Sequence, residues 1–289
     1  MTSQDSLAAL LSRAAVRPED ESELRSLLGA VLADEAARAR AEELAAALAD
    51  QVGRYGERGT VFSPGDADLG PGRGAVPLMA LLAVLPEVDR SLRERGIDDD
   101  ARAATLGEIR RQVDKTVRLT GRPGLSDYSW VETVWRGGFA QLGRLQYELI
   151  REDEGWVLNT HIPAEGAMGL DAVRASLARA RETMQAAYPE VGPLREAVCH
   201  SWLFDRQLPE LLPGSNIAAF ADLWDITPGE SGSGDAEGLY FVFDLPRDAS
   251  RLDVLLPTLT ATSRLQAALL DMWRGGGHLA VGSGRLVFS

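Results

Sequence analysis

Three histidines and one cysteine are the side chains of this 289-residue chain best suited to proton transfer and nucleophilic attack. They are His161, His200, His278 and Cys199, and all four lie in the second half of the sequence. Histidine changes protonation near neutral pH, so it can take a proton from an attacking group. Cys199 is a candidate nucleophile with a histidine as its base, or a buried thiol that behaves as a small apolar side chain. If residues 199 and 200 lie on a strand, their side chains point to opposite faces and do not pair with each other.

Composition restricts the partners that the chain can have. The net charge is −13 and the pI is about 4.8. This balance argues against a nucleic-acid partner, because phosphate backbones are bound by concentrated positive charge. A single cysteine cannot form an intramolecular disulfide or a cysteine-based zinc cluster, so we expect no metal. The N-terminus has no basic segment followed by an apolar run, and the longest apolar stretch, residues 76–85, is too short to cross a bilayer. We therefore expect a cytoplasmic protein with no membrane association.

The first 122 residues have the pattern of a helical domain. Apolar side chains recur at helical spacing in residues 24–32, and Pro18 followed by three carboxylates is typical of a helix start. The pattern predicts helices within residues 5–55, over 76–95 and over 98–119. A Gly- and Pro-rich segment, residues 53–74, separates the first of these from the rest. No strand is predicted before Gly121.

Beyond Pro123 the hydrophobic period shifts toward two, which predicts a second, mixed domain over residues 123–289. Alternation over 145–149 and again over 156–162 predicts a hairpin, followed by a glycine-containing loop at 164–169. A helix is expected from Leu170 to Tyr188. The later elements are predicted as a buried strand at 197–204, a strand at 239–245, a helix at 258–273 and a strand or hairpin at 279–288. The expected fold class is α+β, with a helical N-terminal domain followed by a mixed α/β domain.

Four segments of the second domain carry a family resemblance. They are FAQLGRLQYEL at 139–149, HIP at 161–163, CHSWLFD at 199–205 and LPGSNI at 212–217. With the order of the predicted elements, they resemble a family of bacterial acyltransferase-domain proteins that have a helical N-terminal domain and a GNAT-like C-terminal domain. The resemblance implies an enzyme that moves an acyl group from acetyl- or acyl-coenzyme A, or from a carrier-protein thioester, to an amine.

The resemblance also implies a phosphate-binding loop for coenzyme A. In GNAT enzymes, a glycine loop and the N-terminus of the next helix hold the pyrophosphate. The matching residues here are Gly166, Ala167, Met168, Gly169 and Leu170. The pattern departs from the usual Arg/Gln-x-x-Gly-x-Gly/Ala, because the glycine spacing differs and no Arg or Gln precedes the loop. A strand-to-helix turn that merely needs glycine is the alternative interpretation.

Acyl transfer to an amine needs a base, a donor for the oxyanion and sometimes an acid for the leaving thiolate. His161, at the end of a predicted strand beside the loop, is the expected base, and His200 and Glu148 are alternatives. Tyr240 is the candidate acid, and backbone N–H groups near Cys199 are the candidate oxyanion donors. Cys199 as nucleophile would give a two-step route in place of direct attack.

The implied acceptor is an amine on a small molecule or peptide, and an acyl carrier protein is an alternative donor. Because the loop departs from the family pattern, a non-catalytic module that binds an acyl thioester or a partner protein is the competing hypothesis. A helical adaptor or dimerisation protein is a second one.

Overall fold

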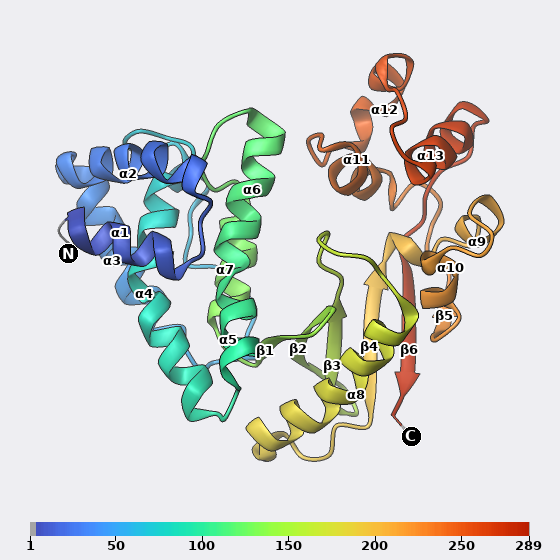
Figure 1. Ribbon diagram of the computed structural model, residues 1–289, viewed down its shortest axis with the longest axis horizontal. Coiled ribbons are helices and arrows are strands. Elements are labelled where there is room, and N and C mark those ends of the chain that lie inside the picture. Colours follow the sequence, from blue (N-terminus) through green and yellow to red (C-terminus); the bar gives the residue numbers. More distant parts are fainter. Residues whose placement is uncertain (1–3, 289) are drawn as a thin grey trace. The chain divides into compact units, whose positions relative to one another are not determined.

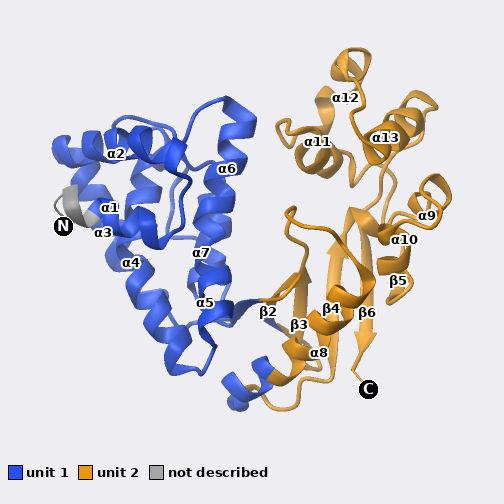
Figure 2. Ribbon diagram, viewed as in Figure 1, with its two compact units in different colours: residues 1–141, 148–150, 183–190 blue, residues 142–147, 151–182, 191–289 orange. Residues whose placement is uncertain are grey.

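A computed structural model describes residues 4–288, which form two compact units (Figures 1 and 2). Unit 1 contains Met1–Gln141, Glu148–Ile150 and Thr183–Glu190, and unit 2 contains Leu142–Tyr147, Arg151–Glu182 and Val191–Ser289. The helical N-terminal part followed by a mixed sheet confirms the predicted α+β class. The domain boundary after residue 122 stays a prediction.

Residues 4–122 of unit 1 consist of helices and loops, as the pattern predicts. The helices are α1 (Gln4–Arg13), α2 (Pro18–Ala33), α3 (Glu35–Gln51), η1 (Pro64–Ala67), α4 (Ala75–Glu94), α5 (Asp99–Leu106) and α6 (Glu108–Thr120), and α7 (Tyr128–Trp135) follows. The prediction of a single helix over 98–119 is wrong, because α5 ends at Leu106 and α6 begins at Glu108, with Gly107 between them. Glycine is a weak helix former, which suits a break at this point.

The core of unit 1 is built around α4, which is buried along most of its length. The segment between α3 and α4 is held by a buried ion pair on α7. Glu132 accepts a hydrogen bond from the backbone N–H of Val61 (3.0 Å) and pairs with Arg136 (2.7 Å). Arg136 also donates to the carbonyl oxygens of Glu57 (2.8 Å) and Gly59 (2.6 Å). This Gly- and Pro-rich segment is therefore an ordered loop.

The sheet has six strands in the order β1-β2-β3-β4-β6-β5. Their bounds are β1 (Phe139–Leu142), β2 (Leu145–Glu152), β3 (Gly155–His161), β4 (Glu196–Ser201), β5 (Asp225–Thr227) and β6 (Gly282–Val287). Strands β3 and β4 pair in parallel, and β6 is antiparallel to both β4 and β5. The predicted hairpin at 145–162 and the strand near 279–288 are confirmed. The strand predicted over 197–204 is confirmed only as far as Ser201, because residues 202–204 form a 3-10 turn.

Helix α8 (Leu170–Ala187) connects β3 to β4, with a 3-10 turn at η2 (Pro189–Val191). Its buried stripe includes Val173, Leu177 and Ala180. Ser176 on the same face accepts from the backbone N–H of Leu145 (3.1 Å), and its hydroxyl donates to the carbonyl of Leu142. These contacts hold α8 against β1 and β2.

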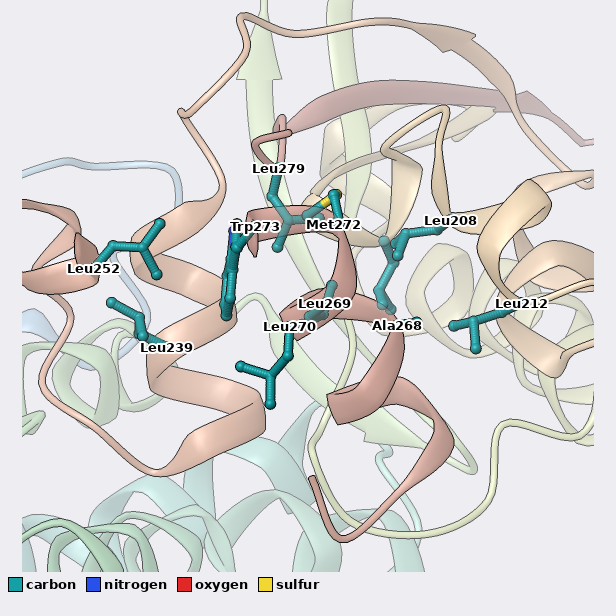
Figure 3. Close-up of a cluster of buried hydrophobic side chains, with 11 residues drawn as sticks. Leu208, Leu212, Leu239, Leu252, Ala268, Leu269, Leu270, Met272, Trp273 and Leu279 are labelled. Carbon is teal, nitrogen blue, oxygen red and sulfur yellow. The ribbon is translucent and has the colours of Figure 1, made fainter. Parts of the chain in front are cut away.

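The remaining elements form a helical group above the ends of β4 and β6 (Figure 1). They are η3 (Trp202–Phe204), α9 (Leu208–Leu211), α10 (Asn216–Ala221), α11 (Asp235–Phe243), η4 (Ala249–Arg251), α12 (Leu252–Leu255), η5 (Leu256–Thr258) and α13 (Arg264–Arg274). Most of them contribute side chains to the apolar cluster drawn in Figure 3, whose buried members include Leu239, Leu269 and Trp273.

Two predictions for this group are wrong. Residues 239–245 are not a strand, because α11 covers Asp235–Phe243. The alternation at 239, 241, 243 and 245 was not diagnostic, since positions 240 and 242 are also apolar. The carboxylates at the first turn favour a helix start. The helix expected from residue 258 begins only at Arg264, where the Ser263 hydroxyl accepts from the backbone N–H of Gln266.

Candidate active site

The two candidate histidines of the central strands lie on the same face of the sheet. The paired positions of β3 and β4 are Leu158 with Ala197 and Asn159 with Val198. His161 and His200 are each two residues beyond the last pair, so they project to the same side as Asn159 and Val198. The register therefore places both histidines on one face, at the C-terminal ends of β3 and β4.

Hydrogen bonds orient both rings. The side-chain amide of Asn159 lies 3.2 Å from Nε2 of His161. Because an amide nitrogen only donates, this contact favours the His161 tautomer that carries its proton on Nδ1. His200 is exposed, and its Nδ1 lies 2.9 Å from the hydroxyl of Ser283 on β6. That contact leaves Nε2 of His200 directed away from Ser283.

Cys199 lies on the opposite face from these histidines. Its neighbours there are Tyr147 on β2 and, through Tyr147, Ser176 on α8. Ser176 has one hydroxyl proton and gives it to Leu142, so the Tyr147 hydroxyl is the donor in the 3.0 Å bond between them. Burial raises the pKa of the Cys199 thiol far above its ordinary value. The thiol is thus held neutral beneath α8.

The glycine loop runs from the end of β3 to the start of α8. Residues 164–167 are exposed, and a side chain added at Gly166 or Gly169 would meet no atom within 4 Å. Gly166 has a φ of +82°, a conformation that favours glycine. The carbonyl of Gly169 accepts the N–H of Val173 (3.0 Å), so α8 starts there, and its first-turn N–H groups have no partner within the helix. An anion can reach this backbone.

The loop also contacts the helical group and an arginine that the sequence did not indicate. Ile162 and Met168 pack against the apolar cluster of Figure 3. Arg144, on the turn between β1 and β2, donates from Nε to the carbonyl of Ala167 (3.1 Å) and from Nη2 to that of Gly166 (3.4 Å). The loop is therefore attached on one side to apolar side chains and on the other to a guanidinium.

Three further candidates lie elsewhere. Glu148 is half-buried on β2, in the segment that clusters with unit 1. Tyr240 is on α11 and mostly buried, and the guanidinium of Arg247 lies 4.3 Å from its ring centroid. His278, in the turn before β6, has Nδ1 2.7 Å from a carboxylate oxygen of Asp235. Catalytic roles for Glu148, Tyr240, Cys199, His161 and His200 stay predictions.

Two buried aspartates organise the chain just before β6. Asp235 accepts from Nε1 of Trp273 (2.7 Å) and from the backbone N–H of Leu279 (2.8 Å). Asp205 accepts from the backbone N–H groups of Gln207 (2.7 Å) and Ala280 (2.6 Å). The sequence suggested Asp205 as a residue that positions substrate or caps a turn, and its bond to Gln207 is such a turn contact. Asp235 was missed, although a carboxylate directly after the Gly/Ser segment 229–234 is a recognisable helix-start signal.

Comparison with protein families accounts for nearly all of the chain. Residues 5–137 match the N-acyltransferase N-terminal domain, and residues 139–286 match the GNAT-like C-terminal domain. The chain is a two-domain GNAT-like acyltransferase. The resemblance stated from the four sequence segments is confirmed.

Solved structures extend the comparison to the whole acyltransferase. An acyltransferase in complex with decanoyl-CoA is 29% identical and superimposes with a TM-score of 0.86, over 99% of this chain and 88% of the other. An acyltransferase in complex with decanoyl-CoA and teicoplanin is also 29% identical, with a TM-score of 0.85 over the same shares. No curated protein sequence matches significantly.

Among residues 4–288, no helix has the length and apolar character needed to cross a membrane. Within the same residues, no group of three or more His, Cys, Asp or Glu side chains could hold a metal ion.

Proposed function

We propose that this acyltransferase moves a medium-length acyl group from coenzyme A to an amine on a small-molecule acceptor. The observation that carries the proposal is the 29% identity, over 99% of the chain, to an acyltransferase in complex with decanoyl-CoA. The arrangement of this chain's own residues fits such a donor. The exposed loop at 164–169 and the start of α8 offer backbone N–H groups for phosphate.

The face of the sheet that carries His161 and His200 is the proposed place of reaction. The acceptor nitrogen bonds to the thioester carbonyl carbon, the C–S bond breaks, and the sulfur leaves as a thiolate. A histidine at the C-terminal end of β3 or β4 takes the proton that the nitrogen loses, and this proton then converts the thiolate to the free thiol of coenzyme A. We assign this role to His161, with His200 as the alternative, and assign oxyanion binding to backbone N–H groups of β4 near Cys199.

The acyl chain is proposed to lie along the apolar side of the loop. Ile162 and Met168 pack against the cluster of α9, α11 and α13, next to half-buried side chains such as Trp202. Apolar walls of this kind reward a longer chain, at about 0.8 kcal/mol for each CH₂ group that is buried. Acetyl-CoA should therefore bind more weakly than octanoyl- or decanoyl-CoA.

Thermal unfolding with acetyl-, octanoyl-, decanoyl- and palmitoyl-CoA tests the donor. A ligand that binds only the native state raises the unfolding temperature, and the rise grows with affinity. We expect a rise that increases from acetyl- to decanoyl-CoA. No rise with any of the four would contradict a coenzyme A donor and would favour a carrier-protein donor.

Turnover is tested with decanoyl-CoA and teicoplanin, the compound held by one of the similar structures. Mass spectrometry should detect acylated teicoplanin, and a thiol reagent should detect an equal amount of released coenzyme A. The variants His161→Gln and His200→Gln separate the two bases, because loss of turnover in one with unchanged donor binding identifies the group that takes the proton. Donor binding without turnover on any amine tried would favour the non-catalytic hypothesis, which the unusual loop motivates.

A further inference from the structure

Arg144 is joined to the glycine loop from a distant part of the sequence. It lies on the turn between β1 and β2, next to Gly143, whose φ is +78°. Its Nε and Nη2 donate to the carbonyl oxygens of Ala167 and Gly166, at 3.1 and 3.4 Å. The guanidinium is therefore placed against the backbone that the proposed function assigns to phosphate.

The third nitrogen of this guanidinium is unused. Nη1 of Arg144 is buried and has no hydrogen-bond partner among the residues that the structure describes. A guanidinium remains charged in proteins, and an unpaired charged donor away from water is costly. Burial lowers the pKa of Arg144, and no charged neighbour contributes to the change. The positive charge is thus left without a carboxylate.

A cation near the loop would offset the carboxylates that surround it. Glu165 is exposed within the loop, and Asp171 is exposed in the first turn of α8. Two carboxylates this close to a phosphate would repel it and offset the attraction of the helix N-terminus. Arg144 brings a positive charge to the same short stretch of backbone, and guanidinium binds phosphate well because its N–H groups match two oxygens.

We propose that Arg144 recognises the diphosphate of the donor and so makes the enzyme selective for coenzyme A thioesters over thioesters without phosphate. This inference rests on the proposed function. Arg144, which lies on the β1–β2 turn, supplies the positive group that the loop sequence lacks. Nη1 is the donor left for a phosphate oxygen. Because Nη1 is buried, the proposal requires the exposed loop to move when the donor binds.

The test compares two donors in the full-length protein. Decanoyl-CoA carries the diphosphate, and S-decanoyl-pantetheine has the same thioester and no phosphate. In the variant Arg144→Gln, we expect KM for decanoyl-CoA to rise tenfold or more, while KM for decanoyl-pantetheine stays within twofold of wild type. Arg144→Lys keeps the charge and should recover part of the loss. Wild-type KM for decanoyl-CoA should rise with salt, and this dependence should weaken in Arg144→Gln.

A matched control removes another arginine that binds a backbone carbonyl. Arg38 in unit 1 donates to the carbonyl of Leu32 (3.0 Å), and Arg38→Gln changes the net charge by the same amount. This variant should leave both KM values unchanged. Equal losses on both donors in Arg144→Gln would show that Arg144 only shapes the loop, and no loss on either would also overturn the proposal. Wild-type protein that uses neither donor would overturn the proposed function and this inference together.

Discussion

The two units use buried charge differently. In unit 1, buried carboxylates pair with arginines: Asp66 with Arg40 (2.8 Å), Asp89 with Arg102 (2.8 Å) and Glu132 with Arg136 (2.7 Å). In unit 2, Asp205 and Asp235 accept from backbone amides and from neutral or titratable side chains, and Arg144 donates to carbonyl oxygens. Each of these three buried carboxylates of unit 1 therefore has an arginine partner, whereas the partly buried Arg144 of unit 2 contacts only carbonyl oxygens. A guanidinium without a carboxylate partner can still bind an anionic ligand, and this is the role that we propose for Arg144.

Removing a carboxylate from unit 1 should have the largest effect on stability. Glu132→Ala leaves Arg136 buried without its carboxylate and also removes the acceptor for Val61. Breaking a buried ion pair in this way costs about 3 to 5 kcal/mol of unfolding free energy. Urea unfolding followed by circular dichroism measures the change. The control is Glu43→Ala, which removes an exposed partner of Arg40 and should cost less than about 0.5 kcal/mol. Similar values for the two variants would show that the buried pair contributes no more than an exposed one.

Removing a carboxylate from unit 2 should lower the free energy of unfolding by a smaller amount. Asp235→Ala leaves the buried Nε1 of Trp273 and the N–H of Leu279 without an acceptor, and no buried arginine is stranded. Unpaired buried donors cost about 1 to 3 kcal/mol each, and water entering beside the exposed His278 should relieve part of this. We expect Asp235→Ala to lose about 2 kcal/mol of unfolding free energy, measured by urea unfolding. The control is Asp248→Ala, which removes an exposed carboxylate that accepts from the N–H of Ser250 in η4. If Asp235→Ala lost as much unfolding free energy as Glu132→Ala, the buried carboxylates of the two units would not differ in their contribution to stability.

The sequence predicted the elements whose pattern is local. The hairpin at 145–162 alternates clearly, and the helices of unit 1 follow helical spacing, so both were found. The α11 segment was missed because an unbroken apolar run fits a strand and a buried helix equally well. The packing of 239–243 against Trp273, a residue far away in the sequence, decides between the two.

The candidate site was predictable in its residues and not in its geometry. Histidine chemistry and the family resemblance pointed to His161 and His200, yet the register of β3 and β4 is what puts them on one face. The opposite placement of Cys199 was predictable, because neighbouring residues of a strand such as β4 point to opposite faces. Arg144 carried no sequence signal, because it reaches the loop from another turn and binds only backbone carbonyls, which any residue provides.

A third prediction concerns the thiol of unit 2, which is buried as a neutral group. Burial raises the pKa of Cys199, so the reactive thiolate should be scarce at pH 8. We expect the native protein to resist iodoacetamide and the unfolded protein to react fully, as measured by mass spectrometry. Cys199→Ala should cost about 1 kcal/mol for the small cavity and should keep turnover within twofold. An acyl group found on Cys199 after incubation with decanoyl-CoA would contradict this and would establish the two-step route.

The smallest effect should appear in the acid stability of unit 1. Hydrogen bonds from Arg40 hold the pKa of Asp66 below its ordinary value of 3.8. A carboxyl whose folded pKa is lowered stabilises the protein above its unfolded pKa, and this contribution is lost as the pH falls through the folded pKa. Asp66→Asn should therefore cost about 1 kcal/mol at pH 7, and the difference from wild type should shrink as the pH drops below about 4. Asp50→Asn, which changes an exposed partner of Arg54, is the control and should show neither effect. A difference for Asp66→Asn that stays constant down to pH 2 would mean that the Asp66 charge contributes nothing, and that only the shape of its hydrogen bonds holds the α3–α4 segment.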